Sequence, residues 1–117
     1  MGKDYPTVRP PLPRGVKLDE NVYVPMRDGV KIAVDVFRPE AEGHYPAILS
    51  MSPYIKEIQH QPPELSHDIE AGATDFYVPK GYIHVIAQIR GTGFSQGKYD
   101  FLDIKQQQDG YDLVEWI

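Results

Sequence analysis

The 117-residue sequence predicts an α/β fold that opens with a β-hairpin and continues with central strands and intervening helices. Three observations lead to this prediction. An Asp-Gly turn separates two β-rich runs, which is a strong hairpin signal. Two later runs are apolar without alternation, as in strands covered on both faces of a sheet. Helical patterns lie between and after these two runs, so the predicted order is β-β-β-α-β-α.

The hairpin follows a proline-rich extended arm, which we assign to residues 1–21. A short β-rich run at Val22–Met26 leads into the turn at Asp28-Gly29, and an alternating strand over Val30–Phe37 leads out of it. One face of that strand carries Val30, Ile32, Val34 and Val36, and the other carries Lys31, Ala33, Asp35 and Phe37. We therefore expect the strand to lie near the edge of the sheet, with the first face buried and the second partly solvated.

The central strands are predicted at Ala47–Met51 and at Tyr82–Ile89, where the sequence is apolar. The dipeptide Lys80-Gly81 comes just before the second strand, and it is typical of a helix end followed by entry into a strand. Because β-branched and other apolar residues fill these runs without alternation, both are expected in the interior of the sheet.

Two helices are predicted beside these strands. The first covers Pro62–Val78 and has polar flanks. The second covers Ile104–Ile117, where apolar residues recur at helical spacing. Gly110 weakens the second pattern, so this helix is expected to begin nearer Gln108.

Composition narrows the class of protein. The net charge of −5 argues against nucleic acid or an anionic membrane surface as a partner. The absence of cysteine excludes a disulfide framework, a thiolate metal site and a cysteine nucleophile. The first residues contain no apolar signal-peptide core, and no stretch approaches the roughly 18 apolar residues of a membrane span. The sequence therefore predicts a soluble cytoplasmic protein.

Four sequence blocks, in order, match one enzyme family. They are the run MRDGVKIAVDVFRP (Met26–Pro39), Ser52-Pro53-Tyr54 with Lys56, the run RGTGFSQG (Arg90–Gly97), and DGYDLVEW (Asp109–Trp116). In these blocks the chain resembles the cocaine esterase-type (CocE/NonD) acyl hydrolases, which are related to Xaa-Pro dipeptidyl peptidases and α-amino acid ester hydrolases. The resemblance covers residues 22–117. It implies a partial α/β-hydrolase domain, the N-terminal half of that fold, which stops before the turn that carries the nucleophile.

Tyr54 is the one residue of this chain to which the resemblance assigns a catalytic role. In the family, this tyrosine follows a central strand and donates its hydroxyl hydrogen to the oxyanion of the tetrahedral intermediate. A phenol suits that task, because its ordinary pKa of about 10 keeps it protonated at neutral pH. The alternative is that Tyr54 simply fills a loop, as other tyrosines do. For the nearby Lys56 we expect a solvated surface charge.

Ser95 lies in a segment, Gly93-Phe94-Ser95-Gln96-Gly97, that matches the G-x-S-x-G pattern of a nucleophile turn. That turn requires a strand running directly into it and a helix directly out of it. Arg90-Gly91-Thr92 separate the predicted strand from the motif, and no helical signal follows. We therefore expect Ser95 to be a loop residue. A phosphate-binding loop is excluded more firmly, since no helix opens behind these glycines.

The histidines suggest neither a metal site nor a general base. His60 and His67, with Glu64 and Asp68, have spacings that could place ligands on one helix face, but a solvated face is the expected state. His84 lies within a central strand and is expected to be a hydrogen-bonded core residue. We predict no metal and no cofactor.

Gln88 is a departure from the family, which usually has aspartate two residues before the Arg-Gly pair. The change removes a negative charge near the loop. A salt bridge between residue 88 and Arg90 is therefore not expected.

The resulting functional hypothesis is part of a serine hydrolase that cleaves ester or amide bonds, acyl or Xaa-Pro, through an acyl-enzyme. Tyr54 would supply the oxyanion-hole hydroxyl, and the serine, acid and histidine would lie outside these residues. We expect the isolated chain to be inactive, its partner to be a small ester or peptide, and an unpaired edge of the third strand to favour self-association. The alternative is a non-catalytic α/β binding or assembly module.

Overall fold

A computed structural model describes residues 11–57 and 73–117. The elements in chain order are strands β1 (Val16–Pro25), β2 (Lys31–Pro39) and β3 (Ala47–Ser52), helix α1 (Thr74–Tyr77), the 3-10 helix η3 (Val78–Lys80), strand β4 (Ile83–Gln88) and helix α2 (Ile104–Trp116). This is the predicted order of strands and helices. Among the helices that the structure describes, none has the length and apolar character needed to span a bilayer.

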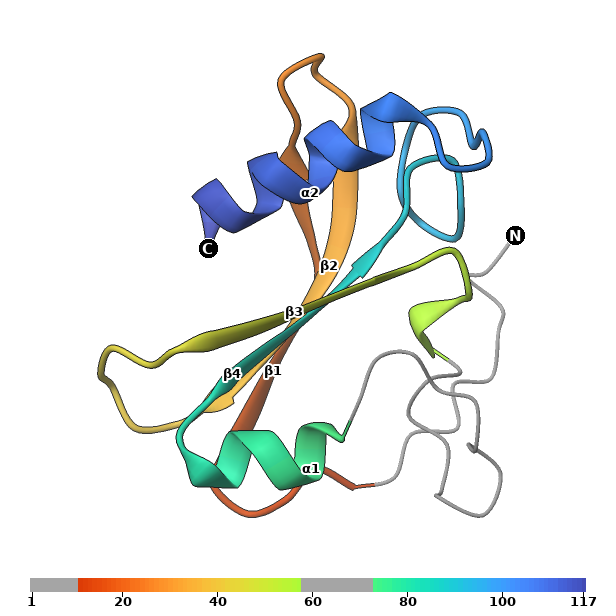
Figure 1. The fold of residues 1–117 in the computed structure, drawn as a ribbon. Helices are drawn as coiled ribbons and strands as arrows, with labels where there is room; N and C mark the ends of the chain where they lie inside the picture. Colours follow the sequence, from red (N-terminus) through yellow and green to blue (C-terminus); the bar gives the residue numbers. More distant parts are fainter. Residues whose placement is uncertain (1–10, 58–72) are drawn as a thin grey trace.

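The strands form one mixed sheet in the order β1-β2-β4-β3. β2 pairs antiparallel with both β1 and β4, whereas β3 runs parallel to β4. Figure 1 shows the strongly twisted sheet with α2 lying across it near one end and α1 near the other. In the described sheet β3 pairs with β4 alone, so the unpaired edge expected for this strand is present, while self-association through it stays a prediction.

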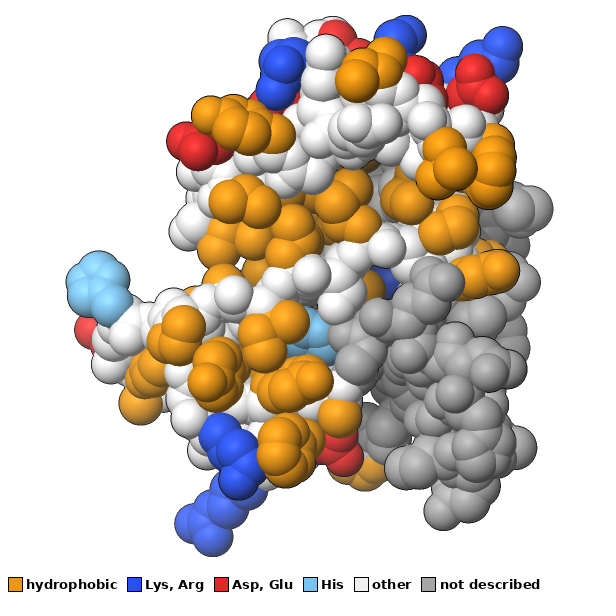
Figure 2. All heavy atoms as spheres, viewed as in Figure 1, with side chains coloured by type: hydrophobic (Ala, Val, Ile, Leu, Met, Phe, Trp, Pro, Cys, Tyr) orange, Lys and Arg blue, Asp and Glu red, His pale blue; other side chains and the backbone are white. Residues whose placement is uncertain are grey.

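Two hydrophobic clusters lie on opposite faces of the sheet, because successive strand residues point to opposite sides. One cluster combines residues of β1, β2 and β4 with Leu113 of α2. The other combines Val16, Phe37 and Ile86 with Val78 of η3. Figure 2 shows hydrophobic side chains gathered on the molecular face between the two helices. α2 and η3 are therefore each anchored to the sheet by a buried apolar side chain, Leu113 and Val78 respectively.

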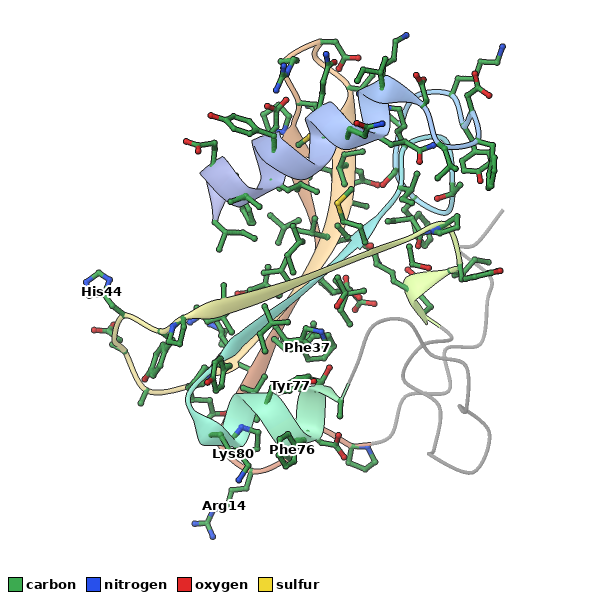
Figure 3. The ribbon with its side chains drawn as sticks, viewed as in Figure 1. Arg14, Phe37, His44, Phe76, Tyr77 and Lys80 are labelled. Atoms are coloured by element: carbon green, nitrogen blue, oxygen red, sulfur yellow. The ribbon has the colours of Figure 1, made fainter. Side chains whose placement is uncertain are left out.

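Aromatic rings attach α1 to the sheet. Tyr77 lies edge-on to His84 with ring centroids 5.8 Å apart, and Phe37 lies 6.5 Å from the same ring. Figure 3 shows Tyr77 on the side of α1 toward Phe37 and the sheet, with Lys80 and Phe76 on the outer side. The Lys80 Nζ atom lies 4.8 Å from the centre of the Phe76 ring. The edge-on contact between Tyr77 and His84 adds to the stabilisation that burial of these rings provides.

The position of β2 in the sheet differs from the prediction. β2 lies between β1 and β4, and is not near the edge. Of its second face, which we expected to be partly solvated, Lys31 at the start of the strand is exposed, but the rest is buried, with Ala33 and Asp35 at 0% and Phe37 at 1% exposure. Alternation suggested a wet face because Lys31 and Asp35 are charged. Tertiary pairing of Asp35 permits its burial instead.

The first strand is also longer than predicted. It begins at Val16, so residues 16–21, which we assigned to the proline-rich arm, belong to the sheet. The register of β1 against β2 shifts between Asp19 and Val22, and Asn21 has a φ of 52°. Such a bulge interrupts the β pattern locally, which is why the sequence revealed only the second half of the strand.

The helices agree with the prediction at the end of η3 and differ from it at the start of α2. Of the helix predicted at Pro62–Val78, residues 62–72 lie outside the described residues. α1 begins at Thr74, with Ala73 as its N-cap, and η3 follows it to Lys80. Gly81 ends η3 in the left-handed conformation, as the Lys80-Gly81 dipeptide predicted. α2 begins at Ile104 and not near Gln108. Its start is set by Asp103, whose side chain accepts a hydrogen bond from the backbone N–H of Lys105 and caps the first turn.

Candidate active site

The predicted site residues meet where the parallel strands β3 and β4 end. Ser52 and Gln88, the last residues of these strands, are paired in register. The loops that follow, residues 53–57 and 89–97, therefore start side by side. The carboxyl ends of parallel strands are where ligands bind in open α/β sheets.

Tyr54 lies in the first of these loops, just beyond β3. Its backbone N–H donates a hydrogen bond to Ser52 Oγ at 3.1 Å, and its carbonyl oxygen accepts one from Gln88 Nε2 at 3.1 Å. The residue is 61% exposed. The backbone of Tyr54 is thus held in place while the side chain is accessible to a ligand. Its role as an oxyanion donor stays a prediction.

Lys56 is not the solvated surface charge that we predicted. It is 1% exposed, and its Nζ atom lies 3.0 Å from Asp35 Oδ1 and 2.6 Å from Glu57 Oε1. Asn21, at the β1 bulge, accepts a hydrogen bond from Lys56 Nζ and donates its backbone N–H to Asp35. The aromatic ring of Phe94 lies 5.7 Å from the ammonium group. A lysine so placed fixes the Tyr54 loop to β1 and β2.

Ser95 is a structural residue of the second loop. Its hydroxyl donates to the carbonyl oxygen of Gln88 at 2.7 Å and accepts from the backbone N–H of Ala33 at 2.9 Å. No helix begins until Ile104, so the strand-turn-helix geometry of a nucleophile turn is missing here. The hydroxyl joins the loop to β2, in agreement with the expectation that Ser95 is a loop residue.

A serine–histidine contact that the sequence did not reveal lies beneath α1. Ser50 Oγ is 3.2 Å from His84 Nε2, and Thr74 Oγ1 is 2.8 Å from His84 Nδ1. This order of groups is similar to that of a catalytic dyad, but His84 is 0% exposed and lies in the middle of the sheet. A hydroxyl also stands where a triad has its carboxylate. His84 is therefore a hydrogen-bonded core residue, as predicted.

Arg90 links the second loop to α2 and to the hairpin turn. Its guanidinium forms two hydrogen bonds of 2.6 Å with Asp109 and one of 2.8 Å with Asp28. These bonds, first that to Asp109 and then that to Asp28, raise the pKa of Arg90 further above its ordinary value. The bond from Arg90 likewise lowers the pKa of Asp28. Arg90 thus forms its salt bridges with these two carboxylates.

Gly91, the next residue, is required by the turn itself. Its φ is +74°, and a Cβ atom there would lie 2.0 Å from the backbone nitrogen of Tyr99. The Arg-Gly pair therefore combines a buried cation with a backbone that only glycine allows.

The described residues offer no site for a metal ion. Within residues 11–57 and 73–117, no group of three His, Asp or Glu side chains is placed to hold one. The residues with metal-like spacing, His60, Glu64, His67 and Asp68, lie outside this range.

A known protein family matches most of this chain. The family model for X-Pro dipeptidyl-peptidases (S15 family) matches residues 28–117. The chain belongs to this family. The match includes the hairpin turn and β2, both loops of the candidate site and α2, so every block that we singled out lies at least partly within it.

Two ester hydrolases and a further family hydrolase show the same relationship. A cocaine esterase of Rhodococcus sp. (strain MB1 Bresler) is 36% identical over 102 residues, covering 83% of this chain and 16% of the esterase. A CocE/NonD family hydrolase from Staphylococcus aureus has a TM-score of 0.73 at 27% identity, over 85% of this chain and 20% of that structure. An α-amino acid ester hydrolase has a TM-score of 0.67 at 26% identity, over 87% of this chain and 18% of that structure.

These comparisons confirm the family and the fold class. The mixed four-stranded sheet with its helices corresponds to part of the α/β-hydrolase fold of the CocE/NonD relatives. The chain spans less than a quarter of the length of each relative named above. Its family is one of esterases and peptidases, all of them hydrolases.

Proposed function

We propose that this S15-family chain forms the part of a serine hydrolase that supplies the oxyanion-hole hydroxyl, from Tyr54, for cleavage of ester or amide bonds through an acyl-enzyme. The observation that carries the proposal is the placement of Tyr54. It follows a strand at the carboxyl edge of the sheet, its backbone N–H and carbonyl groups are hydrogen-bonded, and the residue is 61% exposed. Such a residue can meet a substrate without rearrangement of the loop.

The chemical task of Tyr54 would be electrostatic. As a nucleophile attacks a carbonyl carbon, negative charge develops on the carbonyl oxygen, and a fixed hydroxyl donor stabilises that charge most in the transition state. The donor is useful because its position does not have to be organised during the reaction. Loss of one such donor costs about 10²- to 10³-fold in kcat.

The attacking serine would come from outside the described residues. Ser95 uses its hydroxyl to bridge Gln88 and Ala33, and Ser50 lies against the buried ring of His84. We therefore expect the 117 residues alone to lack esterase activity. Since two of the relatives are named as ester hydrolases, small esters are the first substrates to try.

The experiment is the substitution Tyr54→Phe in the complete protein that carries these residues. We expect kcat for an aryl ester to fall by about 10²- to 10³-fold with little change in KM, because the lost bond forms only in the transition state. Tyr111→Phe is the matched control, since Tyr111 is 63% exposed but lies on α2. An unchanged kcat in Tyr54→Phe would contradict the proposal, and a complete protein with no hydrolase activity would favour a binding module.

A further inference from the structure

The side chain of Gln88 lies at the centre of the Tyr54 loop. Its Nε2 atom is 3.4 Å from the carbonyl oxygen of Ser52, and 3.1 Å from each of the carbonyl oxygens of Pro53 and Tyr54. Its Oε1 atom accepts a hydrogen bond of 2.9 Å from the backbone N–H of Lys56. One amide group thus contacts the backbone of four residues along a single turn of chain. Gln88 itself is 0% exposed.

The chemistry of these partners fixes the orientation of the amide. Thr92 Oγ1 lies 2.9 Å from Gln88 Nε2, and it uses its own hydrogen to donate to the carbonyl oxygen of Ile89. Every group around Nε2 is therefore an acceptor, and the group next to Oε1 is a donor. Reversing the amide would set its oxygen against three carbonyl oxygens.

The second loop is shaped to admit this side chain. A Cβ atom at Gly93 would lie 2.8 Å from Gln88 Cδ and 2.9 Å from Gln88 Cγ. Both of these distances are too short for a real contact, so the absence of a side chain at Gly93 gives Gln88 its space. The two loops of the candidate site are thus packed around one amide.

We propose that Gln88 is a positioning residue for Tyr54: its amide turns the carbonyl groups of residues 52–54 inward and thereby directs the Tyr54 side chain outward toward the substrate. This inference rests on the proposed function of Tyr54. The task requires a hydrogen-bond donor. An aspartate, which the family resemblance leads one to expect at this position, offers no donor when ionised and could not make these bonds to the carbonyl oxygens.

The kinetic test is a double-mutant cycle in the complete protein. Gln88→Glu keeps the length of the side chain and an acceptor for Lys56, but it replaces the donor by a negative charge beside three carbonyl oxygens. We expect kcat for an aryl ester to fall by about 10- to 10²-fold, the effect of a small misplacement of a catalytic group. In the Tyr54→Phe background the same substitution should change kcat by less than about twofold, since the group that it positions is gone.

The matched control is Gln96→Glu in the second loop. Gln96 is exposed, and its Oε1 atom accepts from the backbone N–H of Lys31, an interaction that a glutamate retains. It should leave kcat unchanged. Equal losses of kcat from Gln88→Glu in the Tyr54 and Tyr54→Phe backgrounds would overturn the proposal, because they would show a general structural role.

Hydrogen exchange provides a readout that does not depend on activity. We expect the backbone amides of Tyr54 and Lys56 to exchange faster in Gln88→Met, which removes both the donor and the acceptor, than in the unsubstituted protein. Unchanged exchange would overturn the positioning role even if Tyr54→Phe abolished activity. Faster exchange combined with a silent Tyr54→Phe would instead overturn the proposed function, and with it the catalytic consequence of Gln88.

Discussion

Replacing Lys56 by methionine tests the most unexpected feature of the fold, a buried lysine between two carboxylates. Lys56 is 1% exposed, and its partners Asp35 and Glu57 have side-chain exposures of 0% and 5%. Among the described residues, no group hydrogen-bonds Glu57 Oε2, so this carboxylate depends strongly on Lys56. Methionine fills a similar volume but carries no charge. The substitution therefore leaves buried negative charge with much weaker compensation.

The expected cost is large on the scale of protein stability. Removing one partner of a buried ion pair typically costs about 3–5 kcal/mol, because the remaining charge is left uncompensated. The backbone N–H of Asn21 still reaches Asp35, which favours the lower end of that range. Even about 3 kcal/mol is a large share of the roughly 5–15 kcal/mol that stabilises a typical domain.

The assay is urea denaturation of the purified protein at neutral pH, with the free energy of unfolding taken from the midpoint and slope. Lys98→Met is the matched control, since Lys98 is exposed, and it should change the free energy by no more than about 0.5 kcal/mol. Adding Glu57→Gln to Lys56→Met removes one orphaned charge and should restore more than about 1 kcal/mol. A cost below about 1 kcal/mol for Lys56→Met, with no restoration by Glu57→Gln, would refute the reasoning and return Lys56 to the solvated state expected from sequence.

Two further predictions concern the loop and the helix. Ser95→Ala should leave labelling of the complete protein by a fluorophosphonate intact. It should lower the free energy of unfolding by about 1–3 kcal/mol, because two buried backbone groups lose their hydrogen-bond partner. Loss of labelling would show that Ser95 is the nucleophile. A hydrogen bond from Arg27, 2.8 Å long, lowers the pKa of Asp112. The stabilisation of the fold by this hydrogen bond is therefore present above the unfolded pKa of about 3.9 and is lost as pH falls through the lower pKa of the folded protein. The difference in melting temperature between Asp112→Asn and the unsubstituted protein should accordingly shrink as the pH is lowered from about 7 to about 2. A difference that stayed constant over that range would contradict this.

The local sequence pattern predicted the positions of the strands well, but it predicted the burial of their charged residues poorly. Unalternating apolar runs located β3 and β4 to within one residue at each boundary. β4 is buried in the interior, as expected for such a run, whereas β3 lies at the edge of the described sheet and is mostly half-buried. The same rule failed for β2. Its charged residue Asp35 indicated a solvated face, but Lys56, which follows β3 in the sequence, forms an ion pair with Asp35 in the interior. Pairing over such a distance leaves no periodic signal.

In the candidate site, too, some residues could be assessed from sequence and others could not. Short motifs were enough to assess Tyr54, the pair Arg90-Gly91 and the loop residue Ser95, since turns and strand ends depend on neighbouring residues. The role of Gln88 could not. In the sequence it is a departure from a family pattern, whereas in the structure its amide touches the loop that carries Tyr54.

By itself, then, the sequence determined the α/β class, the order of strands and helices, the family and the position of Tyr54 just after the third strand. These depend on residue spacing within short segments, where backbone geometry fixes which side chains share a face. Only the tertiary structure decided that β2 is interior, that Lys56 is buried, and that Gln88 holds the Tyr54 loop. Each of these depends on a polar group meeting partners from another strand or loop, and burial of a charge or an amide is permitted only where such partners converge.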